Sequence, residues 1–136
     1  MTSEPEIRSV ATAQLTVGEA DLASAVGLEK GDDFPRVFAT AGLVALMEVA
    51  AARLLRPHLS KGELSVGVTV DIVHAVATPL NGTVIATATY VGRDGKLFVF
   101  EVLVADDAGE VGRGTHKRAI ISSERLTAGA AKRLKS

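Results

Sequence analysis

One segment restricts the possible folds more than any other. It is a stretch from Pro35 to Leu55 that is apolar on nearly every side. Glu48 is the only charged residue between Arg36 and Arg53. The proline that opens the stretch suits the first turn of a helix, and Pro57 marks its end. A helix that is apolar nearly all round must be covered on most sides. The positions expected in the core recur at helical spacing: Leu43, Met47, Ala50, Ala51, Leu54 and Leu55.

The remainder of the chain has residue patterns that are typical of β-strands. A first strand is predicted over 7–17, and a loop with one helical turn near 20–26 follows it. Runs rich in Val, Ile and Thr predict four strands after the helix, at 64–78, 83–91, 96–105 and 110–122. The turn sequences TPLNG, GRDG and DDAG separate these four strands. Residues 123–136 are typical of a short helix or a frayed tail.

This order of elements predicts the fold class. Short connections between consecutive strands favour an antiparallel meander, and its curvature would cover the apolar helix. We therefore expect a single α+β domain over 1–136, with its core at about 7–122. A curved five-stranded antiparallel sheet would wrap around a long central helix, which is the layout of the hot-dog fold. Such a sheet leaves two edge strands exposed, so we expect it to pair with a second copy as a homodimer.

Composition excludes several classes of function. The formal net charge is −1 and aromatic residues make up 4% of the chain, which argues against a nucleic-acid partner. The chain has no cysteine, so it has no disulfide framework and no thiol nucleophile. Its longest uncharged run, 37–47, is shorter than the roughly 20 residues of a membrane span. The polar N-terminus does not resemble a signal peptide, so we expect a cytoplasmic protein without a membrane partner.

A histidine stands inside the predicted strand VDIVHAVATP. By the alternation of a strand, His74 shares a face with Val70, Ile72 and Val76. If that face meets the helix, the ring lies at the edge of the core. Two readings remain open: a core histidine bonded to a backbone carbonyl, or a catalytic imidazole.

Two residues of the helix are the matching candidates. Glu48 is either a solvated carboxylate on a narrow polar stripe or a buried one kept for acid–base chemistry. Thr40 lies eight residues earlier on the same stripe, and as a nucleophile it would need an adjacent base. With His74 they form a set of hydroxyl, carboxylate and imidazole, which are the groups needed for acyl transfer. They can converge only if the strand packs beside the helix.

The segment GEVGRGTHKR in the last strand is also unusual. Gly112 and Gly114 indicate a bulge or a close backbone approach to a ligand, but no helix follows as a phosphate loop requires. By alternation, His116 and Arg118 share one face, which we expect to be solvated. The three histidines of the chain lack the spacing of metal ligands, so we predict no metal.

Three longer segments carry a family resemblance: FPRVFATAGLVALMEVAAARLLRPHL, VGVTVDIVHAVATPLNGTV and GEVGRGTHKRAII. Their most specific parts are FAT followed by LME, then H-x-x-x-TP, then GTH-x-RA. In this order and spacing, over about Phe34 to Ile121, the chain resembles the fluoroacetyl-CoA thioesterase family of hot-dog proteins. The resemblance implies a homodimeric hydrolase of acyl-CoA thioesters without metal or cofactor, and it leaves open a further pairing of dimers.

The same resemblance assigns roles to individual residues. It implies catalytic roles for Thr40, Glu48 and His74. It implies that Gly67 helps to hold the thioester carbonyl and that Phe34 is one of two phenylalanines that form a lid over the acyl pocket. It also implies that Arg118 is the arginine of the family's GTH-x-RA motif. We expect Val44, one turn after the threonine, to line the acyl pocket.

Two positions depart from the family pattern. Gly31 lies near the position of the second lid phenylalanine, and Val49 follows the glutamate where the family has an aromatic residue. The predicted substrate is therefore a small or medium acyl-CoA whose acyl group is not specified. The attacking group is also open, and it could be Glu48, Thr40 or an activated water. Two other functions are kept as alternatives: a hot-dog enoyl-CoA hydratase or dehydratase, and a non-catalytic module that binds acyl-CoA.

Overall fold

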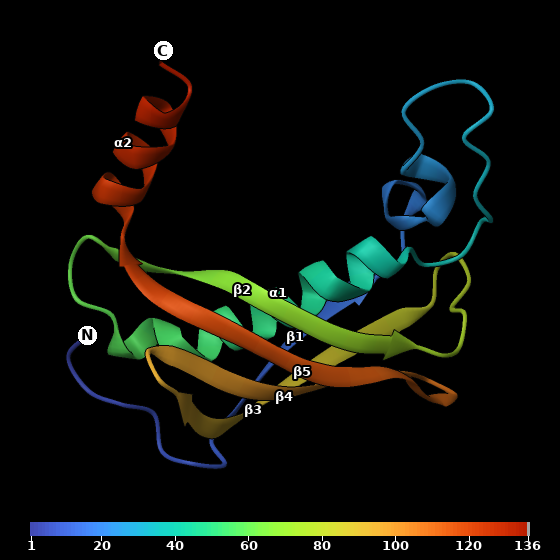
Figure 1. The fold of residues 1–136 in the computed structure, drawn as a ribbon. Coiled ribbons are helices and arrows are strands. Elements are labelled where there is room, and N and C mark those ends of the chain that lie inside the picture. The colour runs from blue at the N-terminus through green and yellow to red at the C-terminus, as the bar shows by residue number, and fades with distance from the viewer. Residues whose placement is uncertain (136) are drawn as a thin grey trace.

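A computed structural model describes residues 1–135 (Figure 1). Five strands and two helices make up its regular structure. In chain order they are β1 (Val10–Thr16), α1 (Thr40–Leu55), β2 (Glu63–His74), β3 (Thr83–Asp94), β4 (Leu97–Asp106), β5 (Gly109–Ser122) and α2 (Ser123–Arg133). Short 3₁₀ turns occupy Glu19–Asp21, Ala23–Ala25 and Arg56–His58. The predicted helical turn near 20–26 and the predicted helix at the C-terminal end are therefore present.

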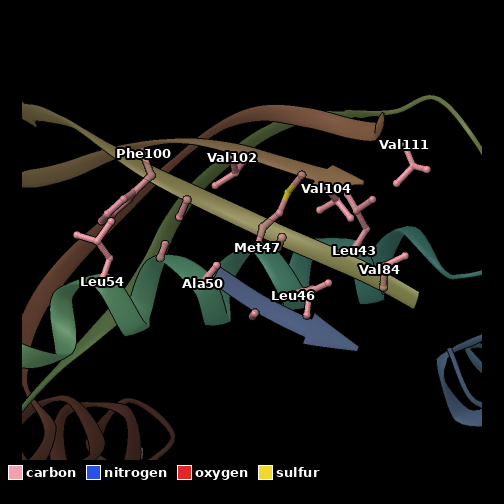
Figure 2. Packing of buried hydrophobic residues seen from close by; sticks show 14 of the residues in the cluster. Leu43, Leu46, Met47, Ala50, Leu54, Val84, Phe100, Val102, Val104 and Val111 are labelled. Atoms are coloured by element: carbon pink, nitrogen blue, oxygen red, sulfur yellow. The ribbon is translucent and has the colours of Figure 1, made fainter. Parts of the chain in front are cut away.

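The five strands form one antiparallel sheet in the order β1-β3-β4-β5-β2. The sheet curls around α1, as the predicted α+β hot-dog layout requires (Figure 1). Leu43, Met47 and Leu54 of the helix lie against the concave face of the sheet, where they meet Phe100 and Val104 (Figure 2). All six positions predicted to face the core are buried. The apolar face of the helix thus supplies one side of the core, and the sheet supplies the other.

The predicted meander of four strands is wrong at one point. β3, β4 and β5 follow one another, but β2 pairs with β5 and β3 pairs with β1. Residues 75–82 cross from one side of the sheet to the other. The N–H of Ala75 donates to Val111 on β5, whereas Val17, just after β1, exchanges backbone hydrogen bonds with Asn81 and Gly82. The TPLNG segment is therefore a crossover past the start of α1 and not a hairpin turn.

The helix begins five residues later than predicted. Residues 35–39 are not helical, because their backbone pairs with other segments. Val37 forms a bridge with Pro79 and Phe38 forms one with Leu22, and the Phe38 N–H donates to the Thr78 carbonyl at 2.8 Å. Thr40 is consequently the first residue of the helix instead of lying one turn inside it.

One face of α1 stays uncovered in the single chain. Ala41, Ala45 and Val49 recur every four residues and are all exposed. The edge strand β2 also has exposed apolar side chains, which are Leu64, Val68, Val70 and Val73. Val76, two residues after the end of β2, is exposed as well. The prediction that the helix is buried on most sides is therefore met on its sheet side only.

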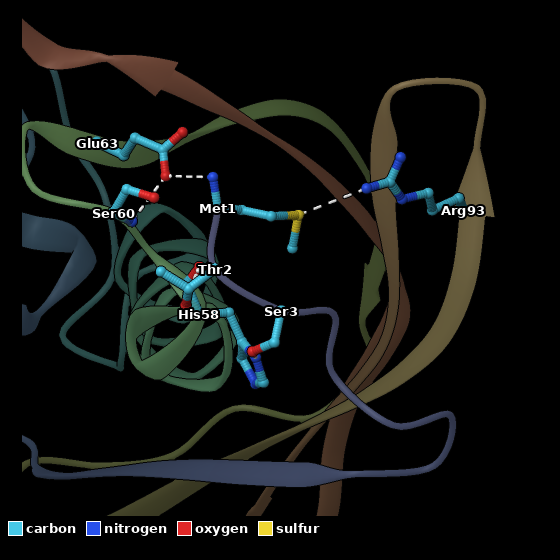
Figure 3. Close-up of polar contacts among 7 residues, drawn as sticks. All are labelled: Met1, Thr2, Ser3, His58, Ser60, Glu63 and Arg93. Carbon is cyan, nitrogen blue, oxygen red and sulfur yellow. Dashed lines mark hydrogen bonds and ion pairs between the residues drawn. The ribbon is translucent and has the colours of Figure 1, made fainter.

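The N-terminal segment is held against the end of the helical region. The amino group of Met1 pairs with the Glu63 carboxylate at 2.7 Å, and Ser3 hydrogen-bonds the ring of His58 (Figure 3). At the C-terminal end of the chain, α2 projects away from the sheet, and none of its residues is buried (Figure 1). Within residues 1–135, neither helix has the length and apolar content needed to cross a membrane.

Candidate active site

The first helical residue and the last residue of β2 meet at one end of the core. The Oγ1 atom of Thr40 lies 2.8 Å from Nδ1 of His74, within hydrogen-bond distance. The rings of Phe38 and His74 meet edge-on, with their centroids 6.4 Å apart. The second ring nitrogen, Nε2, is buried and lacks a hydrogen-bond partner within residues 1–135. A hydroxyl is thus paired with a base that keeps one nitrogen free for proton transfer.

This pair opens onto an apolar pocket of about 420 Å³. The pocket is walled by the segment before the helix and by the crossover after β2. Its lining residues are Ala23, Phe34, Pro35, Val37, Phe38, Thr40, His74, Ala75, Val76 and Ala77. The predicted lid residue Phe34 is therefore in contact with the pocket, but Val44 is absent from its lining. Apolar walls with one polar pair at their edge suit a small acyl group next to a reactive carbonyl.

Glu48 lies in a second cluster farther along the helix. Its Oε1 atom occupies the space that a Cβ on Gly67 would need, so the carboxylate lies directly against the β2 backbone. The same oxygen is 3.9 Å from Nη1 of Arg118. The Glu48 side chain is 42% exposed, so it is half-covered and not buried. Glu48, Gly67 and Arg118, which the family resemblance assigns to the site, therefore lie together.

The two clusters are apart within one chain. Thr40 and Glu48 are eight helical residues from each other, which is about 12 Å along the helix axis. Val44 lies between them on the same side of the helix and is half-buried. The structure therefore brings Thr40 and His74 together, and it brings Glu48, Gly67 and Arg118 together, but it does not unite the two groups within a single chain.

The expectation that His116 and Arg118 lie on a solvated face is wrong. They do share a face, but it is the inner one, and their exposed fractions are 1% and 5%. Arg118 donates to the side chain and the carbonyl of Ser65, both at 3.0 Å, and its Nη1 lies 3.0 Å from Nε2 of His116. Strand alternation identified the pair but could not say which face is inside.

Burial changes the proton affinity of both groups. Desolvation lowers the pKa of His116 below its ordinary value, and its hydrogen bond to the Thr69 carbonyl opposes that shift. Desolvation likewise lowers the pKa of Arg118, while the nearby Glu48 carboxylate acts in the opposite direction. Burial therefore favours the neutral form of the His116 ring, which lies beside the buried Arg118 guanidinium.

The two glycines of the last strand approach protein and not a ligand. A Cβ on Gly114 would clash with the carbonyl oxygen of Asp71, and one on Gly112 would come to 2.9 Å from that of Val73. Both contacts are to the backbone of β2. These glycines therefore let β2 and β5 pack closely where the sheet curls.

The fold and the site together define a class of protein. A five-stranded antiparallel sheet curled around one long helix is the hot-dog fold, and the hydroxyl–imidazole pair at the start of that helix supplies groups suited to acyl transfer. A solved structure supports the fold. A thioesterase superfamily member from Thermus thermophilus aligns with a TM-score of 0.85 at 22% identity, covering 97% of this chain and 94% of that one. At that identity the likeness establishes the fold alone.

More similar proteins identify the family. The family model of the fluoroacetyl-CoA-specific thioesterase matches residues 17–124. The fluoroacetyl-CoA thioesterase of Streptantibioticus cattleyicolor is 41% identical over 96 residues, which cover 71% of this chain and 69% of that protein. A solved structure of a fluoroacetyl-CoA thioesterase aligns with a TM-score of 0.89 at 32% identity, covering 98% of this chain and 99% of that one. The chain belongs to the fluoroacetyl-CoA-specific thioesterase family, and it is a thioester hydrolase of the acyl-CoA thioesterase type.

Proposed function

We propose that the protein is a homodimer that hydrolyses small acyl-CoA thioesters at two equivalent sites, each built from both copies. In this arrangement Thr40 and His74 of one copy face Glu48, Gly67 and Arg118 of the other. The single observation that carries the proposal is the Thr40–His74 pair at the edge of an apolar pocket. The separation of about 12 Å between Thr40 and Glu48 supports the contribution of a second copy.

The uncovered surfaces support the same dimer. The edge strand β2 has unpaired backbone groups on its outer side, and its exposed side chains Val68 and Val70 are apolar. On the exposed helix face of Ala41, Ala45 and Val49, the last residue lines a surface pocket together with Leu64 and Ser65 of β2. Antiparallel pairing of two β2 strands would cover both surfaces and would bring the His74 end of one strand towards the Gly67 end of the other.

The chemistry assigned to the site is simple hydrolysis. In one route, water activated by a carboxylate attacks the thioester carbonyl, and in the other the carboxylate attacks and forms a mixed anhydride that water then hydrolyses. In both routes the C–S bond breaks, CoA leaves as a thiolate that takes up a proton, and the acyl group is released as a carboxylate. Glu48 serves as the nucleophile or as the base that activates water, and His74, oriented by Thr40, moves the proton. Backbone N–H groups near Gly67 would stabilise the oxyanion, and such donors are each worth about 3 kcal/mol. None of these steps needs a metal or a cofactor besides the CoA of the substrate.

The pocket suggests the size of the acyl group. About 420 Å³ of space must also admit the thioester and the start of the pantetheine arm, so a short acyl chain fits best. Phe34 is half-exposed at the pocket and would close over this chain. CoA thioesters are made and used inside the cell, so the proposal also implies a cytoplasmic enzyme.

Mixing two inactive variants tests the shared site. Thr40→Val and Glu48→Gln, each inactive alone, are refolded together in equal amounts. Half of the resulting dimers would be mixed, and each mixed dimer would contain one intact site, so the mixture should regain about a quarter of the wild-type rate. A mixture as inactive as its parts would refute the shared site. Thr40→Val mixed with His74→Asn is the matched control, and it should regain no activity because both groups belong to the same half.

A substrate panel tests the activity itself. Free thiol release is measured with acetyl-, propionyl-, fluoroacetyl-, longer-chain and aromatic acyl-CoAs. We expect the highest kcat/KM with the short acyl groups, and a loss of about a hundredfold or more in kcat for Glu48→Gln. Consumption of an enoyl-CoA without thiol release would instead identify a hydratase. Tight CoA binding without turnover would identify a binding module.

A further inference from the structure

His116 is the one buried histidine of the described chain, and the reaction proposed above gives it no role. It lies on β5 between the edge strand β2 and the aromatic ring of Phe100 on β4, with ring centroids 6.4 Å apart. Both of its ring nitrogens are engaged. Nδ1 is 2.8 Å from the Thr69 carbonyl oxygen, and Nε2 is 3.0 Å from Nη1 of Arg118.

The chemistry of the two partners fixes the state of the ring. A backbone carbonyl only accepts a hydrogen bond, so Nδ1 must be protonated and donate to Thr69. A guanidinium only donates, so Nε2 must be unprotonated and accept from Arg118. His116 is therefore neutral and in the Nδ1–H tautomer. A second proton would place an N–H of a cationic ring against an N–H of a cationic guanidinium.

Both hydrogen bonds of the His116 ring connect it to the candidate site. Thr69 follows a bulge of β2, where the pairing with β5 shifts between Gly67 and Thr69. A Cβ on Gly67 would lie 3.2 Å from Cε1 of His116 and would clash with Oε1 of Glu48, so the ring and the carboxylate approach the same point of the strand. On its other side the ring holds the guanidinium that faces Glu48 at 3.9 Å.

We propose that His116 is a positioning residue, which holds the Gly67 bulge through Thr69 and orients the Arg118 guanidinium towards the Glu48 carboxylate. This inference rests on the proposed thioesterase site. The ring does not touch the reacting atoms, and it acts through the two groups that do. Since its two contacts use different nitrogens, they can be removed one at a time.

The charged groups around the ring are few. Among the described residues, the Arg118 guanidinium on β5 lowers the pKa of the ring and the Glu48 carboxylate on α1 raises it. From β2 it meets the Thr69 carbonyl and its cross-strand neighbour Val70, and from β4 it meets Phe100, none of which titrates. Protonation of the ring would therefore be felt first at Arg118, which would lose an acceptor and turn away from Glu48.

Two pairs of variants separate the two contacts. His116→Gln places an acceptor near the position of Nε2, and His116→Met has a similar length but no acceptor. His116→Asn places a donor near the position of Nδ1, and His116→Leu has the same shape without one. We expect kcat for thiol release to fall about tenfold or more in the His116→Met variant, with little change in KM, and to recover substantially in His116→Gln. We expect kcat of His116→Asn to exceed that of His116→Leu by a similar ratio. Equal kcat within each pair would overturn the proposal.

A spectroscopic measurement tests the ring without any turnover. Two-dimensional NMR correlating the imidazole nitrogens with the ring protons identifies the tautomer of each histidine. We expect His116 in the Nδ1–H form, whereas the Nε2–H form prevails for free histidine, and we expect Arg118→Met to abolish this preference. An Nε2–H ring in the wild-type protein would overturn the proposal, and this reading holds even if the variants fold poorly.

The two hypotheses fail in different ways. If wild-type protein releases no thiol from any acyl-CoA, the proposed function fails, while the NMR measurement still decides the state of His116. If wild type is active and Glu48→Gln is not, but His116→Met and His116→Gln have the same kcat, only the positioning role fails.

Discussion

Gly67 illustrates at the level of one residue how closely the helix and the edge strand approach each other. The carboxylate of Glu48 occupies the space that any Cβ at this position would need. A glycine in a strand normally weakens it, so its presence here is explained by the contact. The absence of one side chain thus sets where the carboxylate lies.

Gly67→Ala should therefore impair activity. The new methyl group would push Glu48 or the strand aside, at a cost of about 1–3 kcal/mol if the groups shift. We expect kcat/KM for thiol release to fall about tenfold or more. Gly129→Ala is the matched control, because nothing lies within 4 Å of a Cβ at that exposed position of α2. A fully active Gly67→Ala enzyme would show that catalysis does not depend on the contact between the Glu48 carboxylate and Gly67.

His116 should make the stability of the protein depend on pH. Its pKa in the folded protein is lowered, so the unfolded chain binds the proton more readily. The contribution to the free energy of unfolding is complete above the unfolded value of about 6.5 and is lost as pH falls towards the folded value. Urea unfolding between about pH 7.5 and pH 5 should show a steeper loss for wild type than for His116→Gln. Parallel curves would contradict this.

At the level of secondary-structure elements, the crossover of residues 75–82 shapes the pocket. It forms one wall of the pocket and carries the chain from β2 to β3 past the start of α1. It is held by the buried hydroxyl of Thr78, which donates to Asp106 at 2.8 Å, and by the Thr78 carbonyl, which accepts from Phe38. The pocket wall is thereby tied to both the sheet and the segment before the helix.

Thr78→Val should loosen this wall. The change keeps the shape of the side chain and removes the hydrogen bond to Asp106, so we expect the free energy of unfolding to fall by about 1 kcal/mol. We also expect a higher KM for acyl-CoA, because Ala75–Ala77 line the pocket. Chemical denaturation and thiol-release kinetics measure the two effects. Thr89→Val, at a threonine on β3 whose hydroxyl makes no side-chain hydrogen bond within residues 1–135, should change neither.

At the scale of the whole molecule, the chain leaves apolar surface on one side. The β2 edge and one face of α1 are exposed together, while the opposite edge, β1, is covered on its inner face by the helix. A surface of this kind is typical of an interface between copies. The proposed dimer would bury it and complete the site in the same step.

Val70→Glu should separate the copies. A carboxylate at the centre of β2 would be buried without a partner in the proposed dimer, so association should weaken strongly. Sedimentation or light scattering should report a monomer that keeps its circular dichroism spectrum but has lost thiol release. Val10→Glu, at an exposed valine of the β1 edge, is the control and should remain associated and active. A fully active monomer would refute the shared site.

The amino-acid sequence by itself determined the elements, the faces and the family. The helical spacing of Leu43 and Met47, the alternation that put His74 on one face with its aliphatic neighbours, and the motifs that matched the family are all local patterns, set by the geometry of one helix or strand. Only the tertiary structure decided that β2 lies beside β5, that His116 is buried, and that the Thr40 hydroxyl meets the His74 ring. Strand pairing and burial depend on contacts between residues distant in sequence. Periodicity along the chain therefore shows which side chains share a face, but not what that face meets.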